Sequence, residues 1–319
     1  MTTKPTILLT GISGFLGSAI AEKLSAKYTV IGLIRKSSNL WRLLEINQNN
    51  IKLLDIESPA LDIELNKLKP NILIHSAWNG VAAADREDWP GQIQNIELTT
   101  NMLLLAKKIG IKKIIGLGSQ AEYGDFEGKI DESFLPNPLS AYGVSKLATM
   151  HIAQTFCNIN NIEFIWLRLF PLYGEKEDLN WFIPMVIQNA LQNNSLNLTA
   201  CEQRYGYLHI TDFTKAIEQV VINSSNTSGI YNLSSHFSIQ LKSIVELIIK
   251  ETKTSGHFNF GALPYRPNQV MQMEGNSNKF YDTFNFSVTN NLEENISKLI
   301  KYYQSKYHQN NEISSSSTK

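Results

Sequence analysis

The sequence predicts an α/β protein built on a doubly wound parallel sheet, with a smaller C-terminal lobe of α+β structure. Over the first 170 residues, short apolar runs alternate with amphipathic segments of helical length, as strands and helices do in a parallel sheet. From residue 171 onward the apolar runs shorten, and Pro171, Gly174 and Pro184 interrupt them. The loss of regular alternation indicates a change of architecture there.

These patterns divide the chain into a main domain and a lobe. We expect residues 1–170 to form the main domain, and a segment near 205–235 to return to it. Residues 171–307 are expected to form mainly the lobe. The last residues, 308–319, are rich in serine and predict a disordered tail.

A glycine-rich turn joins the first strand to the first helix. The apolar run Thr6–Thr10 is followed by Gly11, Gly14 and Gly17, and apolar residues then recur at helical spacing. The first glycine permits a sharp turn, the second lets backbone approach a diphosphate, and the third allows close helix packing. The free N–H groups of the helix start favour phosphate. The predicted dinucleotide contacts here are Gly11, Ser13, Gly14, Phe15, Leu16 and Gly17.

The second strand, Thr29–Arg35, ends in two basic residues. Lys36 follows Arg35, and the sequence has no acidic residue beside them. A carboxylate at this point would accept hydrogen bonds from the adenosine ribose and favour NAD, whereas a cation pairs with the 2′-phosphate of NADP. Arg35 and Lys36 therefore predict a preference for NADP(H), with NAD(H) left possible.

Two more strands are expected to end beside the cofactor. The third, Ile51–Ile56, ends in Asp55 and Ile56, and the Asp55 carboxylate is suited to accept from the adenine amino group. The fourth, Asn71–Ala77, ends in a small residue that allows the cofactor to pass closely. Ala77, Asp55 and Ile56 are therefore candidate cofactor contacts.

Further helices and strands continue the alternation. A long helix is expected over about Gln92–Ile109, a fifth strand over Lys112–Leu117 and a sixth over Glu163–Phe170. His75 lies inside an apolar run, which favours a hydrogen-bonded core histidine over a catalytic one.

Ser119, Tyr142 and Lys146 form the candidate catalytic group. Tyr142 and Lys146 are four residues apart on a helix that Ser140 caps, so they share one helix face. A tyrosine with its usual pKa of about 10 is a weak acid–base group at neutral pH, and a nearby ammonium lowers that pKa. Ser119 follows the fifth strand and is suited to hold a substrate oxygen. This set is typical of hydride transfer between nicotinamide and a carbinol or ketone carbon, with Lys146 also binding the nicotinamide ribose.

In these motifs the chain resembles the extended short-chain dehydrogenase/reductase family, from about Thr6 to Tyr303. The family comprises nucleotide-sugar epimerases, dehydratases and reductases. The resemblance implies an N-terminal Rossmann domain and a nucleoside-diphosphate sugar as substrate. The matching motifs are Thr10-Gly11-x-x-Gly14-Phe15-x-Gly17, Ser119 with Tyr123-Gly124, Tyr142-x-x-x-Lys146, Leu167-Arg168-x-Phe170 with Tyr173-Gly174, and His209-Ile210-Thr211-Asp212.

The resemblance also indicates where the substrate binds. Arg266 looks like the arginine that contacts the diphosphate in the family, and Arg204 and Phe182 fall where the nucleotide usually lies. The candidate substrate-binding residues are Trp78, Gln120, Phe182, Arg204 and Arg266.

Departures from the family pattern narrow the activity. The similar 4,6-dehydratases carry Thr-Asp-Glu where this chain has Ser119-Gln120-Ala121. GDP-fucose synthases place a cysteine at the position of Ala121, and alanine cannot move a proton. The remaining resemblance is to sugar 4-ketoreductases of the abequose type. Pro171 is a further departure, because many relatives have a substrate-contacting asparagine there.

The leading hypothesis is an enzyme that uses NADPH to reduce the C4 ketone of a nucleoside-diphosphate 4-keto-6-deoxy sugar in deoxysugar biosynthesis. A C4 epimerase with tightly held NAD needs the same three side chains and is the alternative. An NADP-sensing binding protein is a more distant alternative, because a sensor has no need of a catalytic tyrosine.

Composition limits the partners and the compartment. The chain has 29 basic and 29 acidic residues and a formal net charge of zero, which argues against nucleic acid or a membrane surface as a partner. Apolar runs are too short to span a bilayer. Cys157 and Cys201 are too few for a disulfide framework or a metal site and suit the reducing cytoplasm.

The resemblance also implies a homodimer. Family members commonly pair through the helix that holds Tyr142 and the long helix before it, forming a four-helix contact. The candidate residues for this apolar surface are Met102, Leu105, Met150 and Ala153, which are equally suited to the core.

Overall fold

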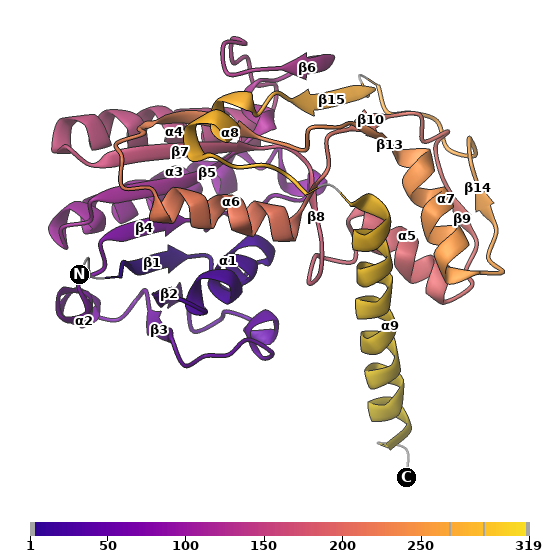
Figure 1. Ribbon diagram of the computed structural model, residues 1–319, viewed down its shortest axis with the longest axis horizontal. Helices are drawn as coiled ribbons and strands as arrows, with labels where there is room; N and C mark the ends of the chain where they lie inside the picture. The colour runs from indigo at the N-terminus through magenta and orange to yellow at the C-terminus, as the bar shows by residue number, and fades with distance from the viewer. Residues whose placement is uncertain (1–3, 268, 290, 317–319) are drawn as a thin grey trace.

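The main domain is a seven-stranded parallel sheet with the strand order β12-β7-β5-β4-β1-β2-β3 (Figure 1). The computed structural model describes residues 4–267, 269–289 and 291–316. The strand order reverses between β1 and β4, which is where open α/β sheets bind ligands. The predicted fold class is confirmed. The strands are β1 (Thr6–Thr10), β2 (Thr29–Ile34), β3 (Ile51–Asp55), β4 (Ile72–His75), β5 (Lys113–Ser119), β7 (Glu163–Leu169) and β12 (Gly229–Leu233).

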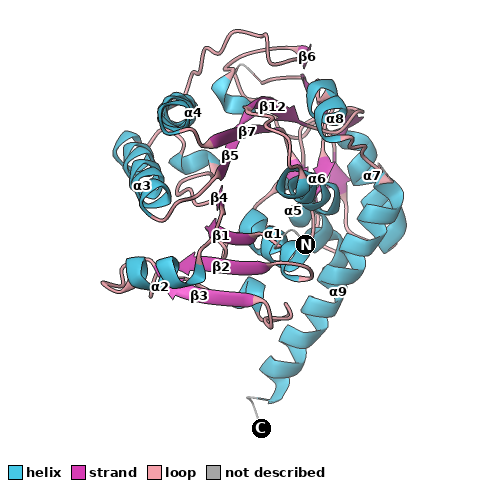
Figure 2. Cartoon of the chain, turned by 60° about the vertical axis from the view of Figure 1, so that its left-hand side comes forward, coloured by secondary structure: helices cyan, strands magenta, loops and turns pink. Residues whose placement is uncertain are grey.

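Helices cover both faces of this sheet (Figure 2). Side chains alternate between the faces along a strand, so Ile7 packs with α1, α6 and α8, while Leu8 packs with α2, α3 and α4. The two resulting apolar cores hold the sheet between two helical layers. The helices are α1 (Phe15–Ser25), α2 (Leu61–Leu68), α3 (Trp89–Lys108), α4 (Ala141–Asn160), α6 (Ile210–Ile222) and α8 (Asn278–Phe284).

Parts of the C-terminal half belong to the main domain. The segment 205–235 supplies α6 and the edge strand β12, which pairs with β7. Helix α8 follows much later in the chain, and its Phe280 and Phe284 contact Tyr231 of β12. The chain therefore crosses between the two parts more than once.

The lobe has three helices around an apolar core of its own. Helices α5 (Phe182–Leu191), α7 (Leu241–Thr252) and α9 (Leu292–Ser316) enclose residues such as Val186, Ile244 and Leu299. A four-stranded sheet, β13-β10-β15-β6, links the lobe to the main domain, because β6 follows β5 in the chain while the other three strands come from the C-terminal half. The short strands are β6 (Gly128–Ile130), β8 (Leu172–Tyr173), β9 (Leu196–Asn197), β10 (Arg204–Tyr205), β11 (Leu208–His209), β13 (Ile239–Gln240), β14 (Phe258–Asn259) and β15 (Gln272–Gly275).

Most element ends differ from the predicted ones by one or two residues, as in β2, β3, β4 and β5. Helix α3 begins at Trp89 rather than Gln92, with Pro90 in its first turn, where the missing N–H group has no helical partner to lose. Strand β7 ends at Leu169, one residue early. Helix α9 continues to Ser316, through most of the segment 308–319 where we expected disorder. Its sequence has no glycine or proline to stop the helix, and residues 317–319 lie outside the described residues.

Candidate active site

The glycine-rich turn packs tightly against the end of β4. Gly11 has φ of +69°, and a Cβ there would come within 2.7 Å of the Ala77 nitrogen. A Cβ on Gly17 would overlap the Gly11 carbonyl oxygen, whereas one on Gly14 would approach that same oxygen at 3.3 Å and no other atom within 4 Å. Glycine is therefore required at Gly11 for the sharp turn and at Gly17 for the close helix packing. At Gly14 the absent side chain leaves the backbone open to a ligand.

The start of α1 fits a phosphate group. Gly14 is its N-cap and supplies no side-chain hydrogen bond to the first turn, so backbone N–H groups there remain available for an anion. Ser13, Phe15 and Leu16 are partly exposed around it. These are the residues predicted to contact a dinucleotide diphosphate, and that contact stays a prediction.

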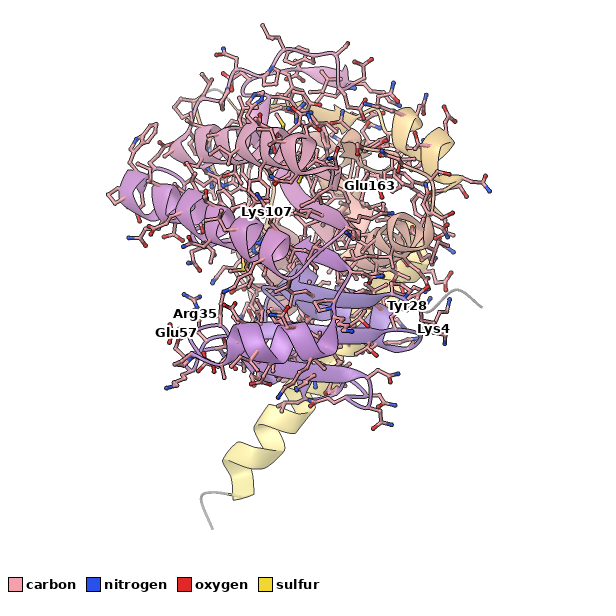
Figure 3. The ribbon with its side chains drawn as sticks, turned by 90° about the vertical axis from the view of Figure 1, so that its left-hand side faces the viewer. Lys4, Tyr28, Arg35, Glu57, Lys107 and Glu163 are labelled. Atoms are coloured by element: carbon pink, nitrogen blue, oxygen red, sulfur yellow. The ribbon has the colours of Figure 1, made fainter. Side chains whose placement is uncertain are left out.

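Arg35 and Lys36 lie exposed just beyond the end of β2. Figure 3 shows Arg35 and Glu57 at one end of the strands, with Tyr28 at the opposite end. The Arg35 guanidinium donates to Asn79 Oδ1 at 3.4 Å. The Asp55 carboxylate accepts from the Glu57 N–H at 3.0 Å, and Ile56 follows it. All four predicted adenosine contacts therefore lie at the carboxyl ends of β2 and β3.

His75 has two hydroxyl partners and no open face. Its Nδ1 lies 2.9 Å from Thr10 Oγ1 and its Nε2 lies 2.9 Å from Thr99 Oγ1. The Thr10 hydroxyl also accepts from the Ala77 N–H, which connects β1 to the end of β4. Burial lowers the pKa of His75 to about 3. The predicted neutral core histidine is present.

Ser119, Tyr142 and Lys146 meet at the carboxyl end of β5. Ser140 caps α4 by accepting from the Gly143 N–H at 3.1 Å, and this turn presents Tyr142 toward Ser119. The two hydroxyl groups share a hydrogen bond. One turn further on, Lys146 Nζ donates to the Leu117 carbonyl at 2.7 Å. All three side chains are at most 9 % exposed, so the group is largely shielded from water.

Burial controls the ionisation of the two titratable groups. It raises the pKa of Tyr142, while the Ser119 hydrogen bond and the positive charge of Arg86 oppose that rise. Burial lowers the pKa of Lys146 to about 7, against the opposing charge of Glu122. We expected Lys146 to lower the pKa of Tyr142. The hydrogen bond from Ser119 has the largest lowering effect on the pKa of Tyr142, and the Lys146 amine donates to the Leu117 carbonyl.

Trp78 covers the amine of Lys146. Its ring centroid lies 3.7 Å from Lys146 Nζ and meets the Tyr142 ring edge-on at 6.1 Å. The indole Nε1 donates to Gln92 Oε1 at 2.9 Å. A cation over a tryptophan face is favourable by about 0.5–2 kcal/mol. Trp78 was predicted to bind substrate, and in this structure it contacts two members of the candidate catalytic group, Tyr142 and Lys146.

Sequence reasoning missed the buried polar residues that bond the backbone and side chains around Trp78 and Ser119. Gln92 and Asn95 of α3 are buried, and they bond the loop after β4 at Trp78 and Asn79. Glu122 ends the short helix η3 (Gln120–Glu122) and is fully buried. The only sequence signal was the position of Glu122 beside the motif Tyr123-Gly124.

The predicted substrate contacts are divided between the two parts of the chain. Gln120 directly follows Ser119 and is partly exposed. Phe182 packs on the lobe core, and Arg204 is exposed and donates to the Ser238 carbonyl at 3.0 Å. Arg266 is exposed in the loop before β15 and lies near Tyr205. The contacts that the structure describes for these last three residues all lie within the lobe.

The chain belongs to the NAD dependent epimerase/dehydratase family, whose model matches residues 7–234. It is 26 % identical to a CDP-abequose synthase of Salmonella muenchen, over 92 % of this chain and 96 % of that protein. It is 31 % identical to a putative UDP-glucose 4-epimerase of Methanocaldococcus jannaschii, over 66 % of this chain and 71 % of that protein. The family consists of NAD(P)-dependent enzymes that act on nucleotide-linked sugars.

A solved structure shows the same fold over nearly the whole chain. UDP-glucuronic acid 4-epimerase from Bacillus cereus, in complex with UDP-glucuronic acid and NAD, superposes with a TM-score of 0.81 at 24 % identity. The match covers 95 % of this chain and 100 % of that one. This similarity shows that the two chains share the same fold.

In the part of the chain that the structure describes, no helix is long and apolar enough to cross a membrane. The same residues contain no cluster of three or more histidine, cysteine, aspartate or glutamate side chains arranged to hold a metal ion.

Because the native state releases the Lys146 proton at about pH 7 and the unfolded chain at 10.5, the unfolded state binds more protons between these values. The free energy of unfolding should therefore rise with pH in this window. From pH 7 to pH 9 we expect wild type to gain about 2 kcal/mol relative to Lys146→Met. Denaturant titrations of both proteins measure this, and parallel pH curves would contradict it.

Proposed function

We propose that the protein uses NADPH to reduce the C4 ketone of a nucleoside-diphosphate 4-keto-6-deoxy sugar, as a step of deoxysugar biosynthesis in the cytoplasm. The observation that carries the proposal is the buried cluster of Ser119, Tyr142 and Lys146, flanked by Gln120 and Ala121 rather than by acids. The similarity to a CDP-abequose synthase over 92 % of the chain supports it. The two cysteines are unpaired and buried, as suits a reducing compartment.

Each residue of the site has a separate role in this reaction. Gly11, Gly14 and the start of α1 would hold the cofactor diphosphate, and Lys146 the nicotinamide ribose. The bound cofactor supplies the hydride for the ketone carbon. Ser119 hydrogen-bonds the C4 oxygen, and Tyr142 transfers its Oη proton to that oxygen as negative charge develops there.

The carboxylate nearest to Ser119 in the chain supports reduction over elimination. Loss of water from a sugar needs an acid and a base beside the substrate. Glu122 is 0 % exposed, and its oxygens accept from the Ser119 N–H, Trp166 Nε1 and Arg168 Nε. A carboxylate with three such bonds and no exposed surface is unsuited to take a substrate proton.

A C4 epimerase with tightly bound NAD is the second candidate. The 31 % identity to a putative UDP-glucose 4-epimerase favours it, and it uses the same three side chains. The two candidates differ in the fate of the cofactor. An epimerase retains it through purification, whereas a reductase consumes added NADPH in proportion to the keto sugar.

Tyr142→Phe removes the proton donor with little loss of binding area. We expect turnover to fall by about 10²–10⁴-fold, the usual range for a general acid, with substrate binding largely kept. The assay is NADPH consumption with a panel of freshly made nucleotide-linked 4-keto sugars. Tyr231→Phe is the matched control, because it removes another buried hydroxyl, bonded to the Thr227 carbonyl.

A second arm of the same experiment uses an unmodified nucleotide hexose. We expect no 4-keto-6-deoxy product, because Gln120 and Ala121 cannot exchange protons. Loss of water detected by mass spectrometry would identify a dehydratase and overturn the proposal.

Arg35→Ala tests the cofactor preference. A charge-assisted hydrogen bond contributes about 1.5–3 kcal/mol, so the Michaelis constant for NADPH should rise about 10- to 100-fold while that for NADH stays nearly constant. Steady-state kinetics with both cofactors measure the difference. Equal changes for NADPH and NADH would show that Arg35 does not read the 2′-phosphate.

We also propose a homodimer that forms through α3 and α4. The residues first expected on this surface are mainly core: Met102, Met150 and Ala153 are buried against the sheet, and Leu105 is partly buried. Each of the two helices has apolar residues on two faces. One face packs on the sheet, and the other face is exposed. The large apolar side chains exposed on α3 and α4 are Trp89, Ile93, Leu104, Val144, Ile152 and Ile159.

Sedimentation at micromolar concentration tests the dimer. We expect wild type to sediment as a dimer and Ile93→Glu as a monomer, because the new charge would be desolvated at the contact. Ile63→Glu is the matched control, since Ile63 is 59 % exposed on α2 and Ile93 is 54 % exposed. A monomeric wild type, or loss of the dimer in both variants, would contradict the assignment.

A further inference from the structure

A buried carboxylate lies directly behind the catalytic serine. Glu122 Oε1 accepts from the Ser119 N–H at 2.9 Å and from Trp166 Nε1 at 2.9 Å, and its Oε2 accepts from Arg168 Nε at 2.8 Å. Trp166 and Arg168 both belong to β7. The backbone of Ser119 is therefore bonded to a charged acceptor that the neighbouring strand holds in place.

A glycine on β5 provides the space that the Glu122 carboxylate occupies. A Cβ on Gly118 of β5 would overlap both Glu122 Oε1 and Trp166 Nε1, so a glycine is required there. The Arg168 guanidinium lies 4.4 Å from the Tyr123 ring centroid, and the Tyr123 hydroxyl donates to Asn232 Oδ1 at 2.7 Å. Glu122 is thus part of a polar network that extends from the catalytic serine through β7 to β12.

We infer that Glu122, locked by Arg168, is a positioning residue of the catalytic centre. It fixes the Ser119 backbone through the N–H bond and, as the carboxylate of an ion pair with Arg168, places a negative charge near Tyr142 and Lys146. A buried carboxylate with a compensating guanidinium keeps its charge and its geometry. The inference rests on the proposed function only for its kinetic arm, because the same three side chains are invoked there.

The electrostatic coupling agrees with the geometry. The charge of Glu122 raises the pKa of Lys146 and that of Tyr142. Removing that charge should let Lys146 lose its proton at lower pH. The charged and titratable groups that face these side chains are Arg168 and Tyr123 beside Glu122, Arg86 beside Tyr142, and His75 beside Lys146.

Two double variants separate the hydrogen bond from the charge. Glu122→Gln with Arg168→Leu keeps a neutral acceptor for the Ser119 N–H but removes both charges. Glu122→Leu with Arg168→Leu removes the acceptor as well. Changing both partners avoids leaving one buried charge unpaired, which would unfold the protein for an unrelated reason.

The matched control is Glu163→Gln with Lys113→Leu. Glu163 and Lys113 form another largely buried ion pair, at 3.2 Å, between the same two strands. These residues begin β7 and β5, so the pair lies at the opposite end of the strands from Ser119. Thermal melts of all three double variants establish that each one folds.

The kinetic arm measures kcat and KM for the keto sugar across pH. In Glu122→Leu/Arg168→Leu we expect kcat to fall about 10- to 100-fold with little change in KM. The reason is that this variant displaces Ser119 but leaves the substrate contacts in place. Glu122→Gln/Arg168→Leu should recover most of that loss. In both variants the alkaline limb of kcat/KM should move to lower pH. Equal kcat values in these two variants and in the control would overturn the inference.

A second arm needs no turnover. In protein labelled with ¹³C at the lysine ε-carbon, Lys146 should titrate near pH 7 in wild type, assigned by its absence in Lys146→Met. The midpoint should fall in both Glu122 variants and stay constant in the control. An unchanged midpoint would refute the electrostatic part of the inference, whether or not wild type reduces a keto sugar. If wild type reduces no keto sugar, that result would refute the proposed function alone.

Discussion

The amine of Lys146, buried in the protein interior, is the constraint around which the candidate active site is built. Taking an ammonium group out of water is unfavourable, and burial lowers the pKa of Lys146 to about 7 despite the opposing charge of Glu122. Three groups stabilise the charged amine against this effect of burial: the Leu117 carbonyl at 2.7 Å, the Trp78 ring at 3.7 Å and the negative charge of Glu122. These partners come from β5, the loop after β4 and η3. The amine therefore depends on three elements that meet beside the second turn of α4.

The main domain was largely predictable because its signals are local. Between Thr6 and Ser25 the sequence changes from an apolar run to a helical period at a glycine-rich turn, and the structure follows that change. The lobe was not predictable in detail, since strands as short as Arg204–Tyr205 contain too few residues to show a period. The place of β12 beside β7 depends on long-range pairing, which no local pattern encodes.

The same distinction holds for the candidate site. Tyr142 and Lys146 lie one helical turn apart, so their shared face could be predicted from spacing. The role of Glu122 could not, because its partner Arg168 is 46 residues away and meets it only through the pairing of β5 and β7. The residues first considered for a dimer surface lie mainly in the core for a related reason: α3 is apolar on two faces, and spacing alone does not reveal which one packs on the sheet.

The position of an acidic residue within η3 decides what it can do. Ser119 is the N-cap of η3, and in a capping box the side chain three residues later turns back to the N-cap backbone. Glu122 stands at that third position and bonds the Ser119 N–H, so its carboxylate faces the sheet interior. A carboxylate at Gln120 or Ala121 would not be captured by this bond. A shift of one or two residues along the turn thus separates an acid that supports the serine from one free to exchange protons with a substrate.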